Sequence, residues 1–164
     1  MAVAEWESGV LFPEANKAEV ARTKALLMEY RKMRLVMEDY EKHRKDLEQV
    51  AIDGEAARRI DQDEVHADKT ANAVIVAEKQ RWVYEQYRYR QTAIVRAYSL
   101  ILSEDVKRAI QHRYFDGHSL KETCLFFGYY EKSSTIRSWV DKGIVAIANN
   151  LKLLGFFDKD AEQF

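Results

Sequence analysis

At 164 residues, the chain has room for one ordinary domain, or for a small domain with a helical extension. Hydrophobic residues make up 47% of it and charged residues 32%, with one Pro and six Gly, which favours a helix-rich protein over a sheet protein or a disordered chain. The single cysteine, Cys124, excludes a disulfide within the chain and a multi-cysteine zinc site. The sequence shows neither a basic leader nor an apolar run of membrane-spanning length, so we expect a cytoplasmic protein with no membrane partner.

The first element predicted is a long helix from residue 14 to about residue 51, a stretch without Gly or Pro. Apolar residues recur along it at alternating steps of four and three, with Arg44 as the one interruption. The members of this seam are Leu26, Tyr30, Met33, Met37, Tyr40 and Leu47. Such a seam requires a partner helix to cover it.

A polar segment follows, in which Gly54 is the clearest signal for the end of the helix. A second long helix is predicted from about residue 63 to residue 102, and Trp82 and Tyr87 are interpreted as packing residues on it. Its apolar stripe consists of Val76, Val83, Tyr87, Ile94, Ala97 and Ile101. The two helices can pair as an antiparallel hairpin or with a second copy of the protein, and the sequence leaves both arrangements open.

Two short helices are predicted next, each marked by its capping residues. Ser103 opens the first, which ends at Asp116-Gly117. Ser119 and Glu122 form a capping box at the start of the second, which Gly128 ends.

A third helix is predicted from residue 133 to residue 154, ended by Gly155, with Phe156 and Phe157 capping the core behind it. Its predicted buried face consists of Ile136, Val140, Ile144, Ile147, Leu151 and Leu154. A short capped helix, a glycine turn and a longer helix are together the outline of a helix-turn-helix unit.

In that geometry the longer helix presents the outward residues of its first turns to the major groove of DNA. The residues opposite the apolar stripe are Lys132, Ser133, Ser134, Arg137, Ser138 and Asp141. From residue 132 to residue 152 four cations, among them Lys142 and Lys152, face one anion, for a net charge of +3. This local excess in a chain of net charge −1 indicates an anion-binding face.

The residue types fit the reading of double-stranded DNA. Arg137 is predicted to contact a base, because arginine reads guanine in bidentate fashion. Lys132, Ser133 and Ser134 are predicted mainly to contact phosphate. Two further residues, Ser138 and Lys142, complete the predicted DNA-binding set.

Three segments, 106–123, 127–129 and 134–140, resemble the fourth, promoter-reading region of bacterial sigma factors. With the long helical N-terminal half and the small size, the whole chain more closely resembles the ArpU/RinA-type phage transcriptional activators. This resemblance implies a phage or prophage regulator that acts in the cytoplasm of a bacterial host, binds promoter DNA of late genes and engages the host RNA polymerase. The turn from Tyr129 to Lys132 is longer than the usual sigma-like turn, which leaves the register of the docking helix open.

Neither catalysis nor metal binding is predicted. The acids lie unpaired on helices, and His43, His66, His112 and His118 are scattered over separate elements without metal-ligand spacing. His112 and His118 are expected to face DNA or solvent. We therefore expect no enzyme, no cofactor and no metal.

The sequence as a whole predicts an all-α protein with two regions. Residues 1–102 form a long helical hairpin or coiled coil for oligomerisation, and residues 103–164 form a sigma-like helix-turn-helix domain. Two alternatives remain open. One is a DNA-packaging component like the phage small terminase subunit, and the other is a helical protein that binds RNA polymerase or another regulator without touching DNA.

Overall fold

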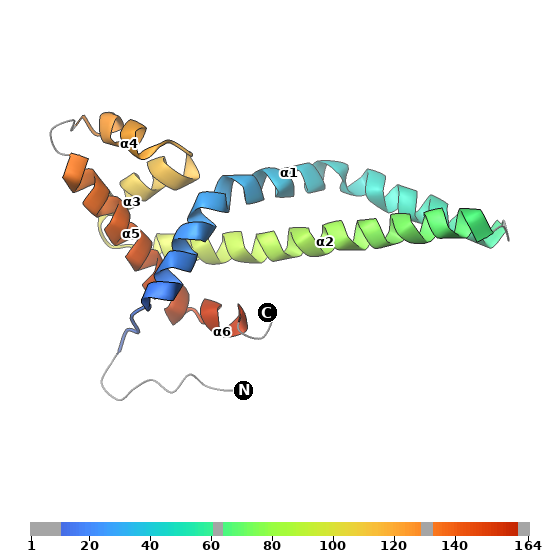
Figure 1. Cartoon of the computed structure of the whole chain (residues 1–164), viewed down its shortest axis with the longest axis horizontal. Coiled ribbons are helices and arrows are strands. Elements are labelled where there is room, and N and C mark those ends of the chain that lie inside the picture. The colour runs from blue at the N-terminus through green and yellow to red at the C-terminus, as the bar shows by residue number, and fades with distance from the viewer. Residues whose placement is uncertain (1–10, 61–63, 129–132, 161–164) are drawn as a thin grey trace. The chain divides into compact units, whose positions relative to one another are not determined.

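The structure of the chain is a computed structural model that describes residues 11–60, 64–128 and 133–160. Every regular element in these ranges is a helix, so the prediction of an all-α fold is confirmed for the part of the chain that is described (Figure 1). Two compact units are present. One comprises the described residues up to Arg31 together with those from Arg90 onward, and the other is Lys32–Tyr89.

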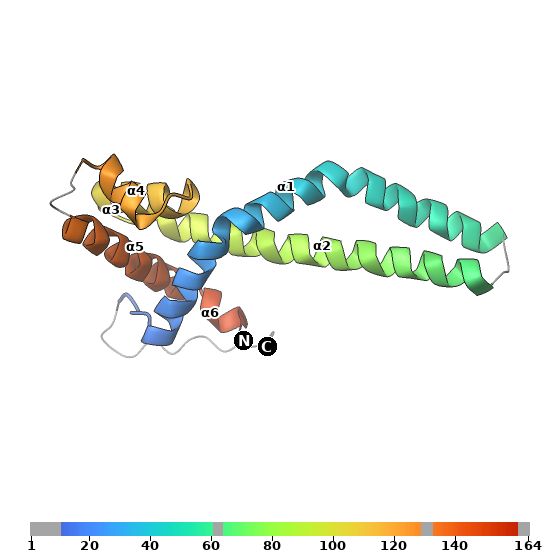
Figure 2. The same ribbon diagram turned by 45° about the horizontal axis from the view of Figure 1, so that its top comes forward.

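The unit Lys32–Tyr89 is a hairpin built from the part of α1 (Lys17–Ile60) that follows Arg31 and from most of α2 (Glu64–Ser99). The two helices run side by side in opposite directions (Figures 1 and 2). The rings of Tyr40 and Tyr84 stack with their centroids 4.7 Å apart, and the Tyr84 hydroxyl donates a 2.6 Å hydrogen bond to Glu41 Oε1. Of the two arrangements that the sequence left open, the long helices therefore adopt the pairing within one chain.

Gly54 does not end the first helix, which continues to Ile60, so this expectation was wrong. One glycine costs a helix interior only about 1 kcal/mol relative to alanine. Most residues that follow Gly54 are good helix formers, and they carry the helix past it. On α2, Trp82 and Val76 were expected to pack, but they are 60% and 49% exposed.

The other unit joins the beginning of α1 and the end of α2 to the C-terminal helices. These are α3 (Glu104–Ile110), the π-helix η1 (Gln111–Phe115), α4 (Leu120–Phe126), α5 (Ser133–Leu153) and α6 (Phe156–Asp160). The units thus do not follow the predicted boundary at residue 102. The reason is that the two long helices, with Ile101 just after α2, contribute buried residues to this second core. These residues are Thr23, Leu27, Tyr30, Ile94, Ala97 and Ile101.

Polar contacts attach the start of the chain to α5. Asn149 Oδ1 accepts a 2.8 Å hydrogen bond from the backbone N–H of Ala15, and Lys152 Nζ lies 3.1 Å from Glu19 Oε1. At the other end of the same core, Tyr30 packs against Phe115 with centroids 4.6 Å apart. The core that holds the C-terminal helices is therefore assembled from both ends of the sequence.

The predicted capping signals are confirmed at the short helices. The Ser103 hydroxyl accepts from the N–H of Val106 at 3.4 Å, and Ser119 forms a reciprocal capping box with Glu122. The chain turns at Gly117 with φ of +81°, as predicted, although the helix before it ends in a π-helical turn. Leu154 is 36% exposed rather than buried, because α5 ends at Leu153 and the chain leaves the helix axis.

Candidate nucleic-acid interface

One face of α5 is fixed in the core, so its opposite face is turned outward. The buried residues of this helix include Ile136, Val140, Ile144, Ile147 and Leu151. α3 lies so close to it that a Cβ placed on Gly143 would be 3.2 Å from Val106 Cγ1 and nearer still to Ile110 Cγ1. Close approach through a residue without a side chain locks the rotation of α5 about its axis.

The predicted DNA-contacting residues on α5 differ in their exposure to solvent. Ser134, Arg137 and Lys142 are exposed, whereas Ser133 and Ser138 are half-buried. Lys132 and the unusually long turn that begins at Tyr129 lie outside the described residues.

These residues do not all share one face of α5. An α-helix turns by about 100° per residue, so Ser134, Ser138, Asp141 and Lys142 point in neighbouring directions. Arg137 lies at the edge of that set, on the side toward α4. The predicted base reader thus lies on the flank of the outward face, next to Asp141, and Ser138 and Lys142 lie nearer the centre of that face.

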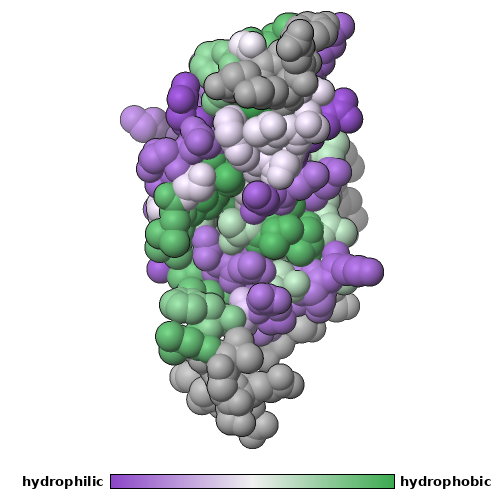
Figure 3. All heavy atoms as spheres, turned by 90° about the vertical axis from the view of Figure 1, so that its left-hand side faces the viewer, coloured by the Kyte–Doolittle hydropathy of each residue, from purple (hydrophilic) through white to green (hydrophobic). Residues whose placement is uncertain are grey.

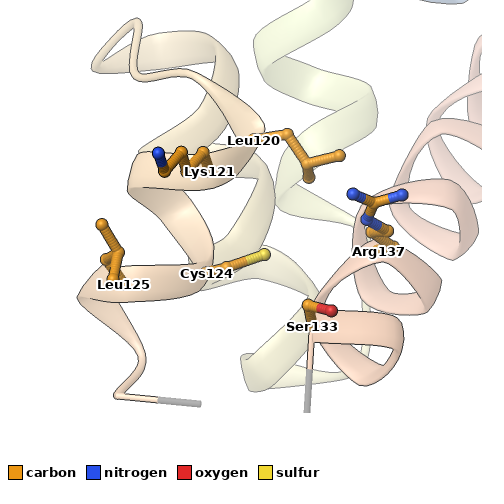
Figure 4. A pocket seen from close by; sticks show the side chains of 6 residues that line it. All are labelled: Leu120, Lys121, Cys124, Leu125, Ser133 and Arg137. Carbon is orange, nitrogen blue, oxygen red and sulfur yellow. The ribbon is translucent and has the colours of Figure 1, made fainter. Parts of the chain in front are cut away.

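Arg137 borders a cleft between α4 and α5 with a volume of about 270 Å³. Figure 4 shows the six residues that line it, which are Leu120, Lys121, Cys124, Leu125, Ser133 and Arg137. The side chain of Leu120 extends toward the guanidinium of Arg137, and that of Lys121 extends away from it (Figure 4). Lys121, which also lines the cleft, was not among the predicted DNA-contacting residues. Its position in the first turn of a capped helix was a signal in the sequence that could have included it.

The short helix α4 is held by its own capping box. Ser119 Oγ accepts from the Glu122 N–H at 3.1 Å, and Glu122 Oε2 accepts from the Ser119 N–H at 2.7 Å. The hydrogen bond from the Ser119 backbone lowers the pKa of the Glu122 carboxyl, and His118 beside it acts in the same direction. Leu125 and Phe126 of α4 are exposed. Hydrophobic and hydrophilic residues are intermixed on the face shown in Figure 3.

His112 was expected to face DNA or solvent, and this was wrong. The ring is 9% exposed and lies between His118 and Phe126, at centroid distances of 4.1 and 4.2 Å. Its Nδ1 lies 3.0 Å from Thr123 Oγ1 on α4. Burial lowers the pKa of His112, and the nearby His118 lowers it further against the opposing effect of Asp116 and Glu122. His112 therefore helps to hold α4 against η1.

Several cations around this surface are engaged with rings or acids. The guanidinium of Arg108 lies 5.3 Å from the centroid of Phe127, and that of Arg113 lies 4.9 Å from the centroid of Tyr114. Lys152, which contributed to the predicted basic excess, pairs with Glu19. The cationic character of the described part of α5 therefore rests on Arg137 and Lys142.

The residues that the structure describes show neither a metal-ligand cluster nor a membrane-spanning helix. No group of three or more His, Cys, Asp or Glu side chains is arranged there to hold a metal ion. Among the same residues, no helix has the length and apolar content needed to cross a membrane. Comparison of the chain with protein-family models, with curated proteins and with solved structures gave no match.

Proposed function

We propose that this chain is a sequence-specific DNA-binding transcription regulator in which α4 and α5 act as a helix-turn-helix. The observation that carries the proposal is the two-sidedness of α5. One face is buried against α3, and the first half of the other face presents polar side chains, among them Ser134, Ser138 and Lys142. A helix supported on one side and polar on the other matches the requirements of the major groove.

Each outward side chain has a role in this proposal. Lys142 pairs with a backbone phosphate, and Ser134 and Ser138 donate to phosphate or to base edges. Asp141 accepts from the amino group of a cytosine, and Arg137 reaches a guanine from the flank beside α4. These contacts need no cofactor and no catalytic step.

The biological setting proposed here rests on the resemblance to the ArpU/RinA-type activators. The chain then acts on late genes of a phage or prophage, with bacterial RNA polymerase as a second partner. The promoter contacts in this proposal come from the unit that contains α5.

The experiment begins with selection of bound fragments from a library of random DNA duplexes, which identifies the sequence that the protein prefers. The affinity for the enriched duplex is then measured as the salt concentration rises. Lys142→Gln is expected to reduce the slope of log K against log salt by about 1, since one phosphate contact is lost. Lys152→Gln is the matched control, because Lys152 is engaged with Glu19, and the slope is expected to stay unchanged.

Sequence reading is tested with Arg137→Ala. Loss of a bidentate contact to guanine is expected to reduce discrimination at one base pair by about 1–3 kcal/mol, while binding to unrelated duplexes falls less. Failure to enrich any duplex at low salt would contradict DNA binding and favour a helical interaction protein. Equal slopes for the Lys142 and Lys152 variants would contradict the assignment of this face.

A further inference from the structure

The hairpin unit Lys32–Tyr89 has one apolar face that surrounds a groove between α1 and α2. The volume of the groove is about 500 Å³. Its apolar lining consists of Val36, Tyr40, Leu47, Val76, Val83 and Tyr84, and Asp39, His43, Lys79 and Gln80 complete the lining. Val36 is 38% exposed and Val76 is 49% exposed, so water reaches apolar side chains contributed by both helices.

The opposite face of the same hairpin is charged. It carries ion pairs between residues four apart on one helix, such as Arg34 with Glu38 at 3.0 Å and Arg81 with Glu85 at 3.2 Å. All four side chains are more than half exposed. The hairpin is thus a single layer of helices with a charged side that suits water and a second side on which apolar groove residues of both helices stay partly open to water.

A helical layer of this kind is stable when a second layer covers its apolar side. The described residues of this unit all belong to α1 and α2, so the unit itself supplies no second layer. We propose that the same face of a second copy of this chain covers the groove. The two hairpins pack in parallel about a two-fold axis that runs along them, and they form a four-helix bundle.

Charges at the rims of the groove favour this partner and this orientation. The stacked rings of Tyr40 and Tyr84 show that these two residues lie at the same height along the hairpin. Because the helices are antiparallel, Asp46, six residues after Tyr40, lies at the height of Glu78, six residues before Tyr84. Lys79 is the next residue along α2. Both Asp46 and Lys79 are exposed, and Asp46 also lies 3.8 Å from His43 Nδ1 on its own helix. Rotation about a two-fold axis parallel to the helices leaves the height of each residue along the hairpin unchanged. It also places α1 of one copy against α2 of the other. Asp46 of one copy therefore lies opposite Lys79 of the second copy.

An antiparallel packing centred on the same groove would face α1 with α1. Because the α1 side of the groove extends from Val36 to Leu47, Asp39 of one copy would then lie within about one helical turn of Asp46 of the other, with His43 the histidine that contacts both acids within its own chain. Two carboxylates would meet at each end, which disfavours that arrangement. The charge pattern therefore selects the parallel dimer.

The first test measures the dissociation constant of the full chain by sedimentation equilibrium. The wild-type chain is expected to form a dimer. Val76→Glu is expected to raise its Kd by more than about 100-fold, since a charge is buried at two symmetric positions. Ile75→Glu is the matched control: Ile75 is equally apolar and 59% exposed but lies about 100° around the helix, and the dimer should persist. Circular dichroism checks that helix content is unchanged.

The second test exchanges charges at exposed positions, where a substitution is expected to leave the folding of the hairpin unchanged. Lys79→Glu and Asp46→Lys are each expected to raise Kd about tenfold, because each alters two symmetric pairs, and the double variant should restore it. A wild-type chain that stays monomeric at all accessible concentrations overturns the proposal. So does an Ile75 variant as weak as the Val76 variant, or a double variant no tighter than the single ones.

Discussion

Thr123 Oγ1 lies 3.0 Å from His112 Nδ1 and 2.9 Å from the backbone oxygen of Ser119. The hydroxyl has a single hydrogen, which it donates to the Ser119 oxygen, so the imidazole nitrogen is the donor in the other contact. His112 in its neutral form is therefore protonated at Nδ1. This bond joins η1 to α4, the helix that supports α5 in the proposed DNA-binding unit.

The first prediction concerns pH. The folded chain lowers the pKa of His112 below the unfolded value of about 6.5, so the unfolded chain takes up the proton first on acidification. The free energy of unfolding is expected to decrease as the pH falls from about 6.5 and to level off once the folded-state pKa has been passed. Urea midpoints measured between about pH 8 and pH 5 provide the check.

The variant for this prediction is His112→Asn, which keeps an N–H donor but does not titrate. Its loss of stability on acidification should be smaller than that of the wild-type chain. Thr92→Asn, at an exposed position on α2, is the control, because it removes no titratable group, and it should retain the wild-type pH dependence. An unchanged pH dependence in the His112 variant would show that another group is responsible.

The second prediction concerns the capping box of α4. Ser119→Ala removes the acceptor for the Glu122 N–H, and the free energy of unfolding should fall by about 1 kcal/mol. Thr92→Ala, at an exposed position inside α2, should change it by less than about 0.5 kcal/mol. Chemical denaturation of both variants compares them, and equal effects would contradict a capping role for Ser119.

Two glycines inside helices are expected to respond to alanine with opposite signs. In Gly143→Ala the new methyl group meets Ile110 and Val106 of α3, so the protein should lose about 1–3 kcal/mol of stability. Gly54→Ala lies within α1, where alanine is the better helix former, and should gain about 0.5–1 kcal/mol. Thermal unfolding distinguishes the two directions, and a neutral Gly143 variant would mean that α3 can move away from α5.

The last prediction compares two neighbouring phenylalanines at the end of the chain. Phe156 is 2% exposed, whereas Phe157 is half-buried with its ring 5.5 Å away. Phe156→Ala is expected to cost about 3–5 kcal/mol, and Phe157→Ala less than half as much. Urea unfolding of the two variants provides the measurement, and equal losses would place both rings in the core.

Local chemistry was the part of this protein that could be read from its sequence. The all-α character, the caps at Ser103 and Ser119, the turn at Gly117 and the buried stripe of α5 up to Leu151 all followed from residues close together in the chain. Burial of Phe156 was also predicted correctly. These features depend on helix periodicity and on hydrogen bonds between neighbours, which a sequence specifies directly.

Features that depend on distant segments were decided by the tertiary structure. The sequence allowed the long helices to pair within or between chains, and the contact between Tyr40 and Tyr84 places them in one hairpin. The burial of His112 required α4 to fold back over η1, and the engagement of Lys152 required Glu19 from the other end of the chain. A helical pattern shows which side chains need a partner, but the packing of the whole chain determines which partner each one meets.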